Sequence, residues 1–384
     1  MKQASMKIAM IGTRGVPANY GGFETCVEEL GQRLVRMGHE VTVYCRKGYY
    51  KEQPPVYLGM SLVYLPNLKY KSLDTLSHTS LSMLHALVRP FDVLMVFNAA
   101  NSPTLILPRL MRRKTAINTD GLEWKRGKWG NAAKRYYKFS EWLSTKFADR
   151  VVADSRGIQE YYRKTYGAES CFIAYGAYPG ESREPDRIRQ FGIERGGYFL
   201  QVTRFEPENN PLLTIQAYKR LRTDKKLVIV GASRYPGDYA RKILSEAEGN
   251  SNIILPGAIY EKELLDEIWC NCFAYVHGNE VGGTNPALLQ AMANGCFTLA
   301  IDVSFSRDVL GDCGLYFSKD AKSLADKMSW ALYNDKSGAL QGYGEMARER
   351  IKMSYSWDKV ATDYEGLFRG LLKNKGSNGR IKND

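Results

Sequence analysis

Short apolar runs alternate along the chain with segments in which apolar residues recur every three or four positions. The first apolar run, Lys7–Ile11, has the length of a strand. The helical pattern that follows it consists of Phe23, Val27, Leu30, Leu34 and Met37. Gly38 ends this helix and residues 40–45 form the next apolar run, so the chain opens with a strand–helix–strand unit.

The same alternation predicts two series of elements. The further strands of the first series are residues 62–65, 92–97, 115–119, 150–153 and 171–175, with helices over 131–148 and 157–166. The strands of the second series are residues 198–203, 226–230, 252–255, 272–276 and 297–301, with helices over 209–222, 237–248, 260–270, 286–294 and 321–333. Nearly continuous apolar strands separated by helices indicate buried parallel sheets.

Residues 176–187, GAYPGESREPDR, interrupt the alternation with two prolines, two glycines and dense charge. We therefore predict an α/β protein with two Rossmann-like, doubly wound domains. They are an N-terminal domain over 1–178, a linker over 179–190 and a C-terminal domain over 191–354. Such domains bind ligands at the carboxyl ends of their strands, so we expect the chemistry in the loops that follow strands, in a cleft between the domains.

Composition and charge narrow the class of protein. The 54 Lys and Arg against 41 Asp and Glu give a net charge of +13, which favours an anionic partner: nucleic acid, nucleotide phosphates or an acidic membrane surface. No apolar run approaches the roughly 18 residues that span a bilayer, and the N-terminus lacks a signal-peptide pattern. The seven cysteines are scattered without a C-x-x-C pair. We expect a cytoplasmic protein without disulfides or a zinc site.

The first candidate loop is GTRGVPANYGGFE, residues 12–24, between the first strand and the first helix. Its glycines, at 12, 15, 21 and 22, permit close approach of the backbone to a ligand, and the helix that follows offers free N–H groups to an anion. The spacing is neither G-x-G-x-x-G nor a P-loop, which weakens a dinucleotide or Walker-type reading. Arg14 is placed to meet a phosphate or an acidic acceptor. The alternative is a structural turn.

The second loop, NTDGLEWKRGKW, residues 118–129, carries two carboxylates, Asp120 and Glu123. Asp120 follows a strand end, where it either faces the cleft or forms an Asx turn into Gly121. Over residues 124–147, seven basic residues interleave with seven aromatic ones. This mixture suits a nucleic-acid surface or a helix in a membrane interface, but also an ordinary amphipathic helix with a solvated basic face.

Two further loops belong to the C-terminal domain. Arg204, in QVTRFEPENNP, follows a strand and suits phosphate recognition, although a salt-bridged surface arginine remains the alternative. The segment HGNEVGGTNPALLQAM, residues 277–292, joins a strand to a helix that begins at Pro286. It predicts a second helix N-terminus for an anion, with Glu280 in the loop and Gln290 one turn into the helix.

The four loops together resemble those of the GT-B glycosyltransferases of family 4, a retaining group that uses nucleotide sugars. The segments MKIAMIGTRGVPANYGGFETCVEEL, DGLEWKRGKW, RFEPENN and HGNEVGGTNPALLQAM are most similar to the branch that includes bacterial rhamnosyltransferases of surface-polysaccharide synthesis. The resemblance covers about residues 6–370. It implies that a last helix, residues 355–372, crosses back to the N-terminal domain and that residues 373–384 form a flexible tail.

The resemblance also implies roles for individual residues. It carries over donor binding to Gly21, Gly22, Arg204, Thr284 and Asn285. With the loop positions described above, we expect catalytic roles for Asp120, Arg204 and Glu280, further donor contacts from Gly283 and Gln290, and the acceptor side at Arg14 and Glu123. No metal is expected, since the chain has no D-x-D triplet. The expected partners are a dTDP- or UDP-linked sugar and a polyprenyl-diphosphate-linked saccharide at an anionic membrane surface, with nucleic acid disfavoured and a peripheral location on the inner face of the cell membrane.

Three positions depart from the wider family. Asn209 stands where a lysine normally follows the arginine at a distance of five residues. The usual pair of glutamates separated by seven residues is replaced by Gly282 and Gln290, with Glu280 two positions earlier. Asp120 stands where many relatives have histidine. Gln290 and Asn209 keep one rival open, a non-catalytic module that binds sugar nucleotides or nucleic acid. A second rival, a UDP-sugar epimerase of similar two-domain build, is disfavoured by the basic aromatic stretch at 124–147, which suits transfer to a lipid-linked acceptor.

Overall fold

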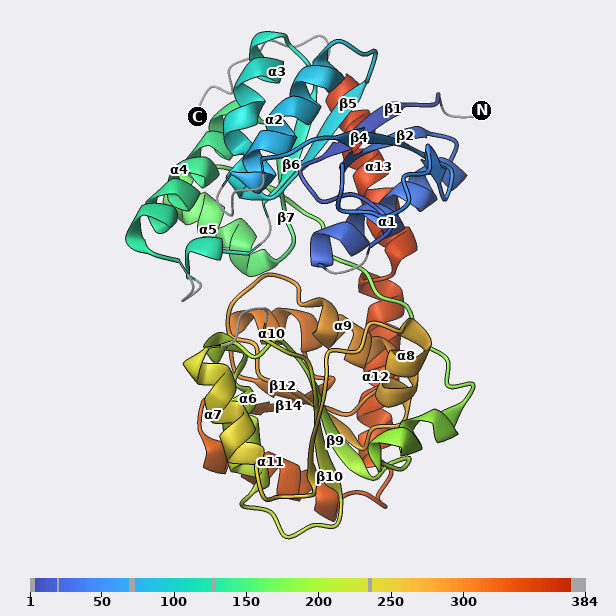
Figure 1. Cartoon of the computed structure of the whole chain (residues 1–384), viewed down its shortest axis with the longest axis vertical. Helices are drawn as coiled ribbons and strands as arrows, with labels where there is room; N and C mark the ends of the chain where they lie inside the picture. The colour runs from blue at the N-terminus through green and yellow to red at the C-terminus, as the bar shows by residue number, and fades with distance from the viewer. Residues whose placement is uncertain are drawn as a thin grey trace. The chain divides into compact units, whose positions relative to one another are not determined.

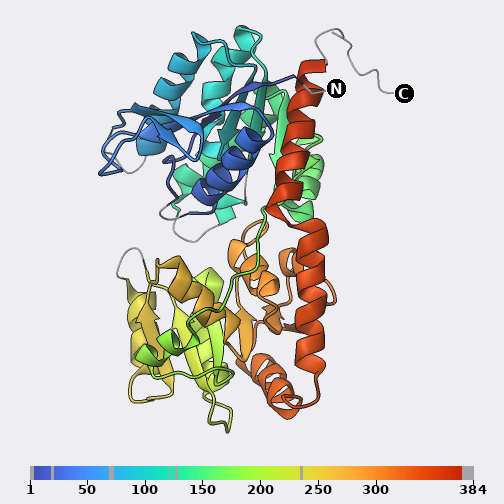
Figure 2. The ribbon, with the colours of Figure 1, turned by 90° about the vertical axis from the view of Figure 1, so that its right-hand side faces the viewer.

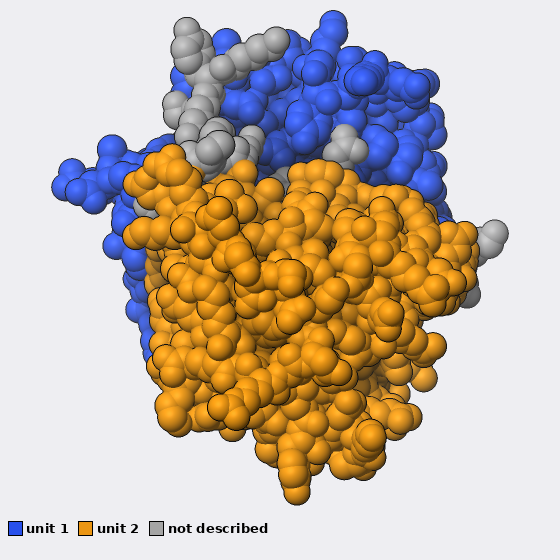
Figure 3. All heavy atoms as spheres, turned by 60° about the horizontal axis from the view of Figure 1, so that its bottom comes forward, with its two compact units in different colours: residues 1–124, 129–174, 357–384 blue, residues 125–128, 175–356 orange. Residues whose placement is uncertain are grey.

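The chain forms two compact units (Figure 3). The computed structural model describes residues 4–18, 21–68, 73–119, 121–125, 129–233 and 237–373. Unit 1 comprises residues 1–124, 129–174 and 357–384, and unit 2 comprises residues 125–128 and 175–356. The chain thus returns to unit 1 after completing unit 2.

Unit 1 is built on a sheet that has eight strands within the described residues, in the order β3-β4-β2-β1-β5-β6-β7-β8. The strands are β1 (Lys7–Ile11), β2 (Glu40–Arg46), β3 (Val56–Tyr57), β4 (Met60–Leu65), β5 (Val93–Phe97), β6 (Thr115–Asn118), β7 (Arg150–Ala153) and β8 (Cys171–Phe172). All neighbours pair in parallel except β3, which is antiparallel to β4. The helices are α1 (Gly22–Arg36), α2 (Asp74–Leu87), α3 (Ile106–Leu110), α4 (Asn131–Phe147), α5 (Arg156–Tyr166) and α13 (Trp357–Lys373), with 3₁₀ turns η1 (Ala99–Leu105) and η2 (Glu123–Lys125).

The C-terminal helix α13 packs against α1 in unit 1. Figures 1 and 2 show α13 and α2 on opposite faces of the sheet. The inward side chains of α13 are Trp357, Val360, Ala361, Tyr364, Phe368 and Leu371. Polar contacts fix its register, because Asn118 Nδ2 donates to Tyr364 Oη over 2.8 Å and Arg33 Nε contacts Asp358 Oδ1 at 2.8 Å. Lys373, expected in a flexible tail, is the last residue of this helix, and residues 374–384 lie outside the described residues.

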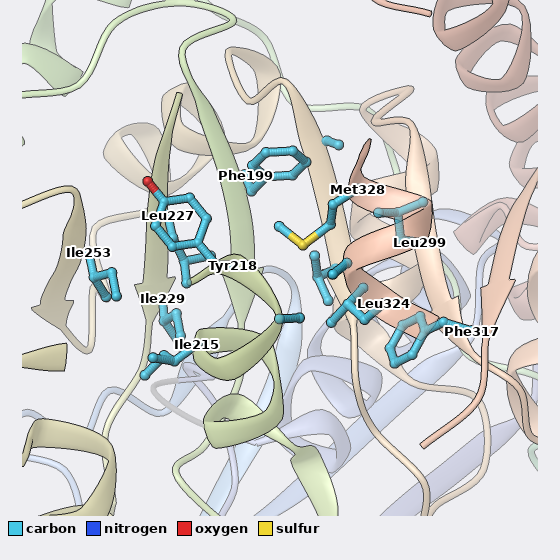
Figure 4. Close-up of a cluster of buried hydrophobic side chains, with 14 of the residues drawn as sticks. Phe199, Ile215, Tyr218, Leu227, Ile229, Ile253, Leu299, Phe317, Leu324 and Met328 are labelled. Atoms are coloured by element: carbon cyan, nitrogen blue, oxygen red, sulfur yellow. The ribbon is translucent and has the colours of Figure 1, made fainter. Parts of the chain in front are cut away.

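Unit 2 contains a fully parallel sheet in the order β11-β10-β9-β12-β13-β14. The strands are β9 (Tyr198–Val202), β10 (Lys226–Val230), β11 (Ile253–Gly257), β12 (Ala274–His277), β13 (Thr298–Ile301) and β14 (Gly314–Phe317). The helices are α6 (Pro211–Tyr218), α7 (Asp238–Ala247), α8 (Lys262–Cys270), α9 (Pro286–Ala293), α10 (Ser304–Leu310), α11 (Ala321–Tyr333) and α12 (Ala339–Ser354), with 3₁₀ turns η3 (Pro185–Phe191) and η4 (Pro207–Asn209). Strand and helix side chains such as Phe199, Leu299 and Met328 meet in one buried core (Figure 4).

The segment predicted as a linker is held by one buried carboxylate of unit 2. Glu267, on α8, accepts hydrogen bonds from Ser182 Oγ at 2.5 Å and from the backbone N–H groups of Arg183 and Glu184, each at 2.6 Å. These hydrogen bonds lower the pKa of Glu267 against the opposing effect of desolvation, which is the largest single influence on it. The segment therefore enters unit 2 along a defined path.

Several predicted boundaries were wrong for identifiable reasons. The helix expected over 209–222 starts at Pro211 because Asn210 takes a left-handed backbone conformation, with φ 55°. The strand expected over 272–276 is β12, which begins two residues later and ends one residue later. The pattern also missed β14, α10 and α12. None of the helices in the described part of the chain is both long enough and apolar enough to cross a membrane.

Candidate active site at the carboxyl edge of the unit 2 sheet

The carboxyl edge of the unit 2 sheet gathers most of the predicted donor-binding residues. Arg204 follows β9, and the loop from Gly278 to Asn285 follows β12. This loop feeds α9, whose first turn is capped by Asn285: its Oδ1 accepts a hydrogen bond from the backbone N–H of Ala287 at 2.9 Å. Proline at the first helical position suits the fixed φ of that turn. The start of α9 and the loop with Arg204 therefore lie at the same edge of the sheet, because β9 and β12 are neighbouring parallel strands.

Glu280 is the centre of a charged network at this edge. Its carboxylate accepts a short hydrogen bond from Asn210 Nδ2 and contacts Lys319 Nζ at 2.8 Å. The Asn210 amide also donates to the carbonyl of Gly278 over 2.9 Å, and the Glu280 N–H donates to the carbonyl of Glu208 over 3.0 Å. The loops after β9, β12 and β14 are thus tied together around one carboxylate.

Asn209, one of the three departures noted in the sequence, has its side chain turned into the protein. It is buried, and its Nδ2 donates to the carbonyl of Arg204 over 3.0 Å. Its own carbonyl accepts from Gln201 Nε2 at 3.0 Å. A Cβ on Gly278 would lie 2.5 Å from that same carbonyl oxygen, which explains the glycine. Asn209 therefore shapes the Arg204 loop, and Lys319 brings a cation to the same edge.

A small pocket opens at this edge. Its lining residues are His277, Asn279, Glu280, Val281, Gly282, Gly283, Asn285, Leu288, Phe305 and Ser306. His277 forms part of its wall, with Nδ1 3.3 Å from Tyr275 Oη. Burial lowers the pKa of His277 to about 3, so the imidazole is neutral at pH 7. The wall of the pocket therefore includes the Glu280 carboxylate and a neutral histidine.

Gln290 and Thr284 complete the predicted donor set. Gln290, on α9, donates from Nε2 to the carbonyl of Tyr178 over 3.2 Å. Thr284 and Gly283 are buried in the loop that precedes α9. The amide of Gln290 therefore already has a backbone partner within unit 2.

The glycine-rich loop of unit 1 is held by two glutamates of α1. Glu24 Oε1 accepts from the backbone N–H of Arg14 at 3.2 Å, and Glu28 Oε2 accepts from that of Ala18 at 2.7 Å. Gly21 precedes α1 with φ 128°, and a Cβ at this position would collide with Glu24 Oε2. A carboxylate thus lies directly against Gly21, next to Gly22 at the start of α1.

The two acceptor-side residues also lie in unit 1. The Arg14 guanidinium stands over the Tyr49 ring, 5.4 Å from its centroid. Glu123, in η2, accepts a hydrogen bond from Trp129 Nε1 at 3.0 Å. Asp120, predicted to be catalytic, lies outside the described residues.

Sequence reasoning missed Lys319 and Asn210 as members of the site. Asn210 was visible only as the residue before Pro211, and its left-handed backbone had no local signal beyond the tolerance of asparagine for that conformation. Lys319 follows β14, a strand that the pattern did not reveal. Recognising β14 would have placed Lys319 at the carboxyl edge with the other loops.

Comparison with known families places two matches along the chain. Residues 183–350 match the family described as Glycosyl transferases group 1, and residues 109–178 match a domain of unknown function, DUF1972. The first match covers β9 to β14 and the whole of the candidate site. The second covers β6, α4, β7 and α5 of unit 1.

Two curated bacterial proteins are similar in sequence. One is the N-acetylgalactosamine-N,N'-diacetylbacillosaminyl-diphospho-undecaprenol 4-alpha-N-acetylgalactosaminyltransferase of Campylobacter jejuni, 26% identical over 226 residues, which are 57% of this chain. The other is the lipopolysaccharide 1,2-N-acetylglucosaminetransferase of Salmonella typhimurium, 27% identical over 237 residues, or 56% of this chain. The matches span 59% and 61% of the length of these two relatives.

Solved structures share the fold across nearly the whole chain. Sucrose-phosphate synthase from Thermosynechococcus elongatus aligns with a TM-score of 0.80 at 18% identity, covering 95% of this chain and 99% of that one. Anabaena HepE in complex with UDP aligns with a TM-score of 0.76 at 14% identity, covering 95% and 100%. The chain therefore has the GT-B fold of two Rossmann-like units, and its second unit contains the stretch that matches the glycosyl transferases group 1 family.

Proposed function

We propose that the protein is a glycosyltransferase that moves a sugar from a nucleoside diphosphate donor to a lipid-linked saccharide during cell-surface polysaccharide synthesis. The observation that carries the proposal is the carboxyl edge of unit 2. There Arg204, the α9 N-terminus and the Glu280–Lys319 network lie within the stretch that matches the glycosyl transferases group 1 family. The two relatives named above, both sugar transferases, support the class of reaction.

The donor diphosphate needs positive charge and N–H donors where its own negative charge develops. Arg204 offers a planar fork of donors that fits phosphate oxygens. The free N–H groups at the start of α9 and the positive end of its dipole add to this without a cation. We assign to Lys319 the positive charge that Asn209 lacks, because Lys319 pairs with Glu280, which also accepts a hydrogen bond from Asn210, the neighbour of Asn209.

The proposed reaction proceeds with retention and without a metal ion. The bond between the anomeric carbon and the diphosphate oxygen breaks while the acceptor oxygen bonds to the same face of that carbon. The acceptor proton passes to the departing phosphate, so the protein needs no strong base. Fixed donors aimed at the leaving phosphate provide the main stabilisation of the transition state. Asp120 and Glu280 would position hydroxyl groups of the sugars.

We favour rhamnose carried by dTDP as the donor. Gln290 is neutral where the family has a ribose-binding glutamate, and a neutral amide binds a hydroxyl less strongly than a carboxylate does. A deoxyribose lacks the 2′-hydroxyl. The replacement of glutamate by glutamine should therefore lower the affinity for dTDP less than the affinity for UDP. A UDP-linked sugar is the alternative.

The proposed acceptor is a saccharide on a polyprenyl diphosphate. One relative's name includes a diphospho-undecaprenol acceptor, and another's a lipopolysaccharide. A polyprenyl chain lies in a bilayer, so an enzyme that uses it must work at a membrane surface, here the inner face of the cell membrane.

A panel of nucleotide sugars tests the proposal directly. The purified protein is incubated with each donor, first alone and then with a polyprenyl-diphosphate-linked saccharide, and the released nucleoside diphosphate and the extended saccharide are measured. We expect release with dTDP-rhamnose and its stimulation by the acceptor. Binding of nucleotides without release or transfer for every donor would support the non-catalytic alternative, and interconversion of UDP-sugars would support an epimerase.

A further inference from the structure

Three neighbouring helices of unit 1 carry large apolar side chains that point into solvent. The 3₁₀ turn η1 packs against α2, α3 and α4 and so joins them in one layer (Figure 1). The exposed apolar residues are Leu81, Leu84 and Val88 on or just after α2, Ile106, Leu107, Leu110 and Met111 on or just after α3, and Phe139 and Trp142 on α4. Val88 is 81% exposed and Leu110 is 74% exposed, far more than a core position allows.

The exposed side of α4 combines aromatic and basic residues. Arg135, Phe139, Trp142 and Lys146 follow at spacings of four, three and four, which places them on one helix face, and all four are exposed. The rings of Phe139 and Trp142 stack with centroids 5.9 Å apart. The opposite face holds the buried residues Ser140, Glu141, Leu143 and Ser144. Two aromatic residues thus face outward, while three of the four buried residues are polar, which is unusual for an amphipathic helix.

The charge of this part of the chain is strongly positive. Residues 81–147 contain twelve Lys and Arg but four Asp and Glu. Among those acids, Glu141 is buried and accepts hydrogen bonds from Tyr161 and Tyr166, each at 2.9 Å. The negative charge of Glu141 is therefore turned away from the surface on which the basic side chains lie.

We propose that the outward side of α2, α3 and α4, hereafter the three-helix surface, docks onto an anionic lipid bilayer. Its exposed leucines, Met111, Phe139 and Trp142 would enter the boundary between headgroups and acyl chains, and the lysines and arginines around them would meet lipid phosphates. Apolar and cationic groups side by side match the two layers of an anionic membrane better than they match a protein surface. The lipid dependence of the reaction rests on the proposed function, but the docking itself does not.

Docking here would bring the lipid surface close to the acceptor-side loop. Helix α4 begins directly after the residues that follow β6, where Glu123 lies, and its 17 residues span about 25 Å. The three-helix surface lies along and beside this helix. The distance from the bound membrane to the loop with Glu123 would therefore be at most about the length of α4. A saccharide attached to a membrane lipid would need to span no more than this distance within unit 1.

Flotation with lipid vesicles tests the docking. The vesicles are phosphatidylcholine with or without phosphatidylglycerol, and the full chain is compared with two double variants. Leu110→Glu with Met111→Glu places charge in the apolar part, and Arg135→Glu with Lys146→Glu reverses charge on α4. The matched control, Leu244→Glu with Met353→Glu, changes the same residue types at exposed positions of unit 2. Every substituted side chain, in the variants and in the control, is exposed, so folding should be retained.

The expected result is that the parent and the control float with anionic vesicles and are released by salt. Each lost cation should weaken binding roughly fivefold, and reversal of its charge should weaken it further. The apolar variant should lose binding even at low salt. Parent-like binding by both variants would overturn the proposal.

Activity measurements separate this proposal from the proposed function. The variants should keep the parent's rate with a short soluble acceptor and lose rate only with a membrane-embedded one. A parent that binds vesicles but transfers no sugar would contradict the proposed function and leave the docking intact. If the parent protein transfers sugar but does not bind anionic vesicles, the docking proposal is wrong and the proposed function still holds.

Discussion

Lys319 Nζ lies 2.8 Å from Glu280 Oε1, and this contact joins the loop after β14 to the loop after β12. The lysine side chain is 58% exposed and the glutamate side chain 23% exposed. An ion pair so open to water contributes at most about 1 kcal/mol to folding. The pair therefore adds little to stability, and its proposed role is in binding the donor.

Replacement of Lys319 by methionine should raise the KM for the nucleotide sugar about tenfold while changing kcat little. The lost charge removes attraction to the donor diphosphate, which acts in the ground state and the transition state alike. Lys319→Arg should restore most of the affinity. The unfolding free energy should fall by less than about 1 kcal/mol. An unchanged KM in Lys319→Met would show that the lysine forms the ion pair with Glu280 but does not contact the donor.

Arg204→Ala should remove most of the transfer activity. The loss of a preorganised charged donor to the leaving phosphate is worth about 2–4 kcal/mol of transition-state stabilisation, or about 30- to 1000-fold in rate. Arg220→Ala, at an exposed position on the same unit, provides the control and should behave as the parent. The melting temperature should be nearly unchanged in both variants. Parent-like turnover by Arg204→Ala contradicts the assignment.

Gly21→Ala should lower both the melting temperature and the donor affinity. Its φ of 128° is rarely adopted by alanine, and the added Cβ would meet Glu24 Oε2. Gly38→Ala is the matched control, because Gly38 also has a positive φ, 92°, but a Cβ there would have no atom within 4 Å. Each substitution should cost about 1–3 kcal/mol of backbone strain. Calorimetry should show weaker nucleotide binding only for Gly21→Ala, and retained affinity would mean that the loop is structural.

Gln290→Glu should move the nucleotide preference toward UDP. A carboxylate binds a ribose hydroxyl more strongly than an amide does, and it gives up the hydrogen bond that Gln290 now donates to the carbonyl of Tyr178. Competition of UDP and dTDP against a labelled donor measures the ratio, which we expect to change by about tenfold. A parent that already prefers UDP strongly would contradict the dTDP assignment.

The buried histidines predict loss of stability in acid. Burial lowers the pKa of His277 to about 3 and, as the largest of several influences, that of His78 to about 4, whereas an unfolded histidine titrates near 6.5. Between these values the unfolded chain binds more protons, so the stability is present above pH 6.5 and is lost as the pH falls toward 3 or 4. A fall from pH 7.5 to 5 should cost about 2 kcal/mol per histidine.

Thermal unfolding at the two pH values checks this prediction. His277→Asn should unfold at a lower temperature at pH 7.5 but should change less between pH 7.5 and 5 than the parent does. His78→Asn, in unit 1, should reduce the pH dependence independently. Equal pH dependence in the parent and His277→Asn would show that His277 takes up a proton without unfolding.

The sequence pattern predicted the architecture because most strands are short apolar runs that stand out from helical periodicity. Lys7–Ile11, Arg150–Ala153 and Lys226–Val230 have the same bounds in the pattern and in the structure. The strand β14 was missed because Gly314–Phe317 is a four-residue segment that opens with glycine, and two of its four residues are half-exposed. Its absence from the prediction also hid the place of Lys319.

The candidate site was less predictable because its contacts join distant loops. Glu280 meets a residue 70 positions earlier, Asn210, and one 39 positions later, Lys319. No local spacing reveals such a meeting. The inward orientation of Asn209 was likewise hidden, because its type alone fits either a ligand contact or a buried hydrogen bond. The positions of loops followed from the strand pattern, but the directions of their side chains required the packed sheet.

The membership of α13 in unit 1 sets an order for folding during synthesis. Unit 2 has residues 175–356 available before α13 has been made, whereas the apolar side of α1 must wait for Tyr364, Phe368 and their neighbours. On the ribosome the later part of the chain can therefore reach its native packing before the earlier part does, contrary to the usual N-terminal-first sequence. A chain truncated before Trp357 would lack α13, so unit 1 could not complete its packing.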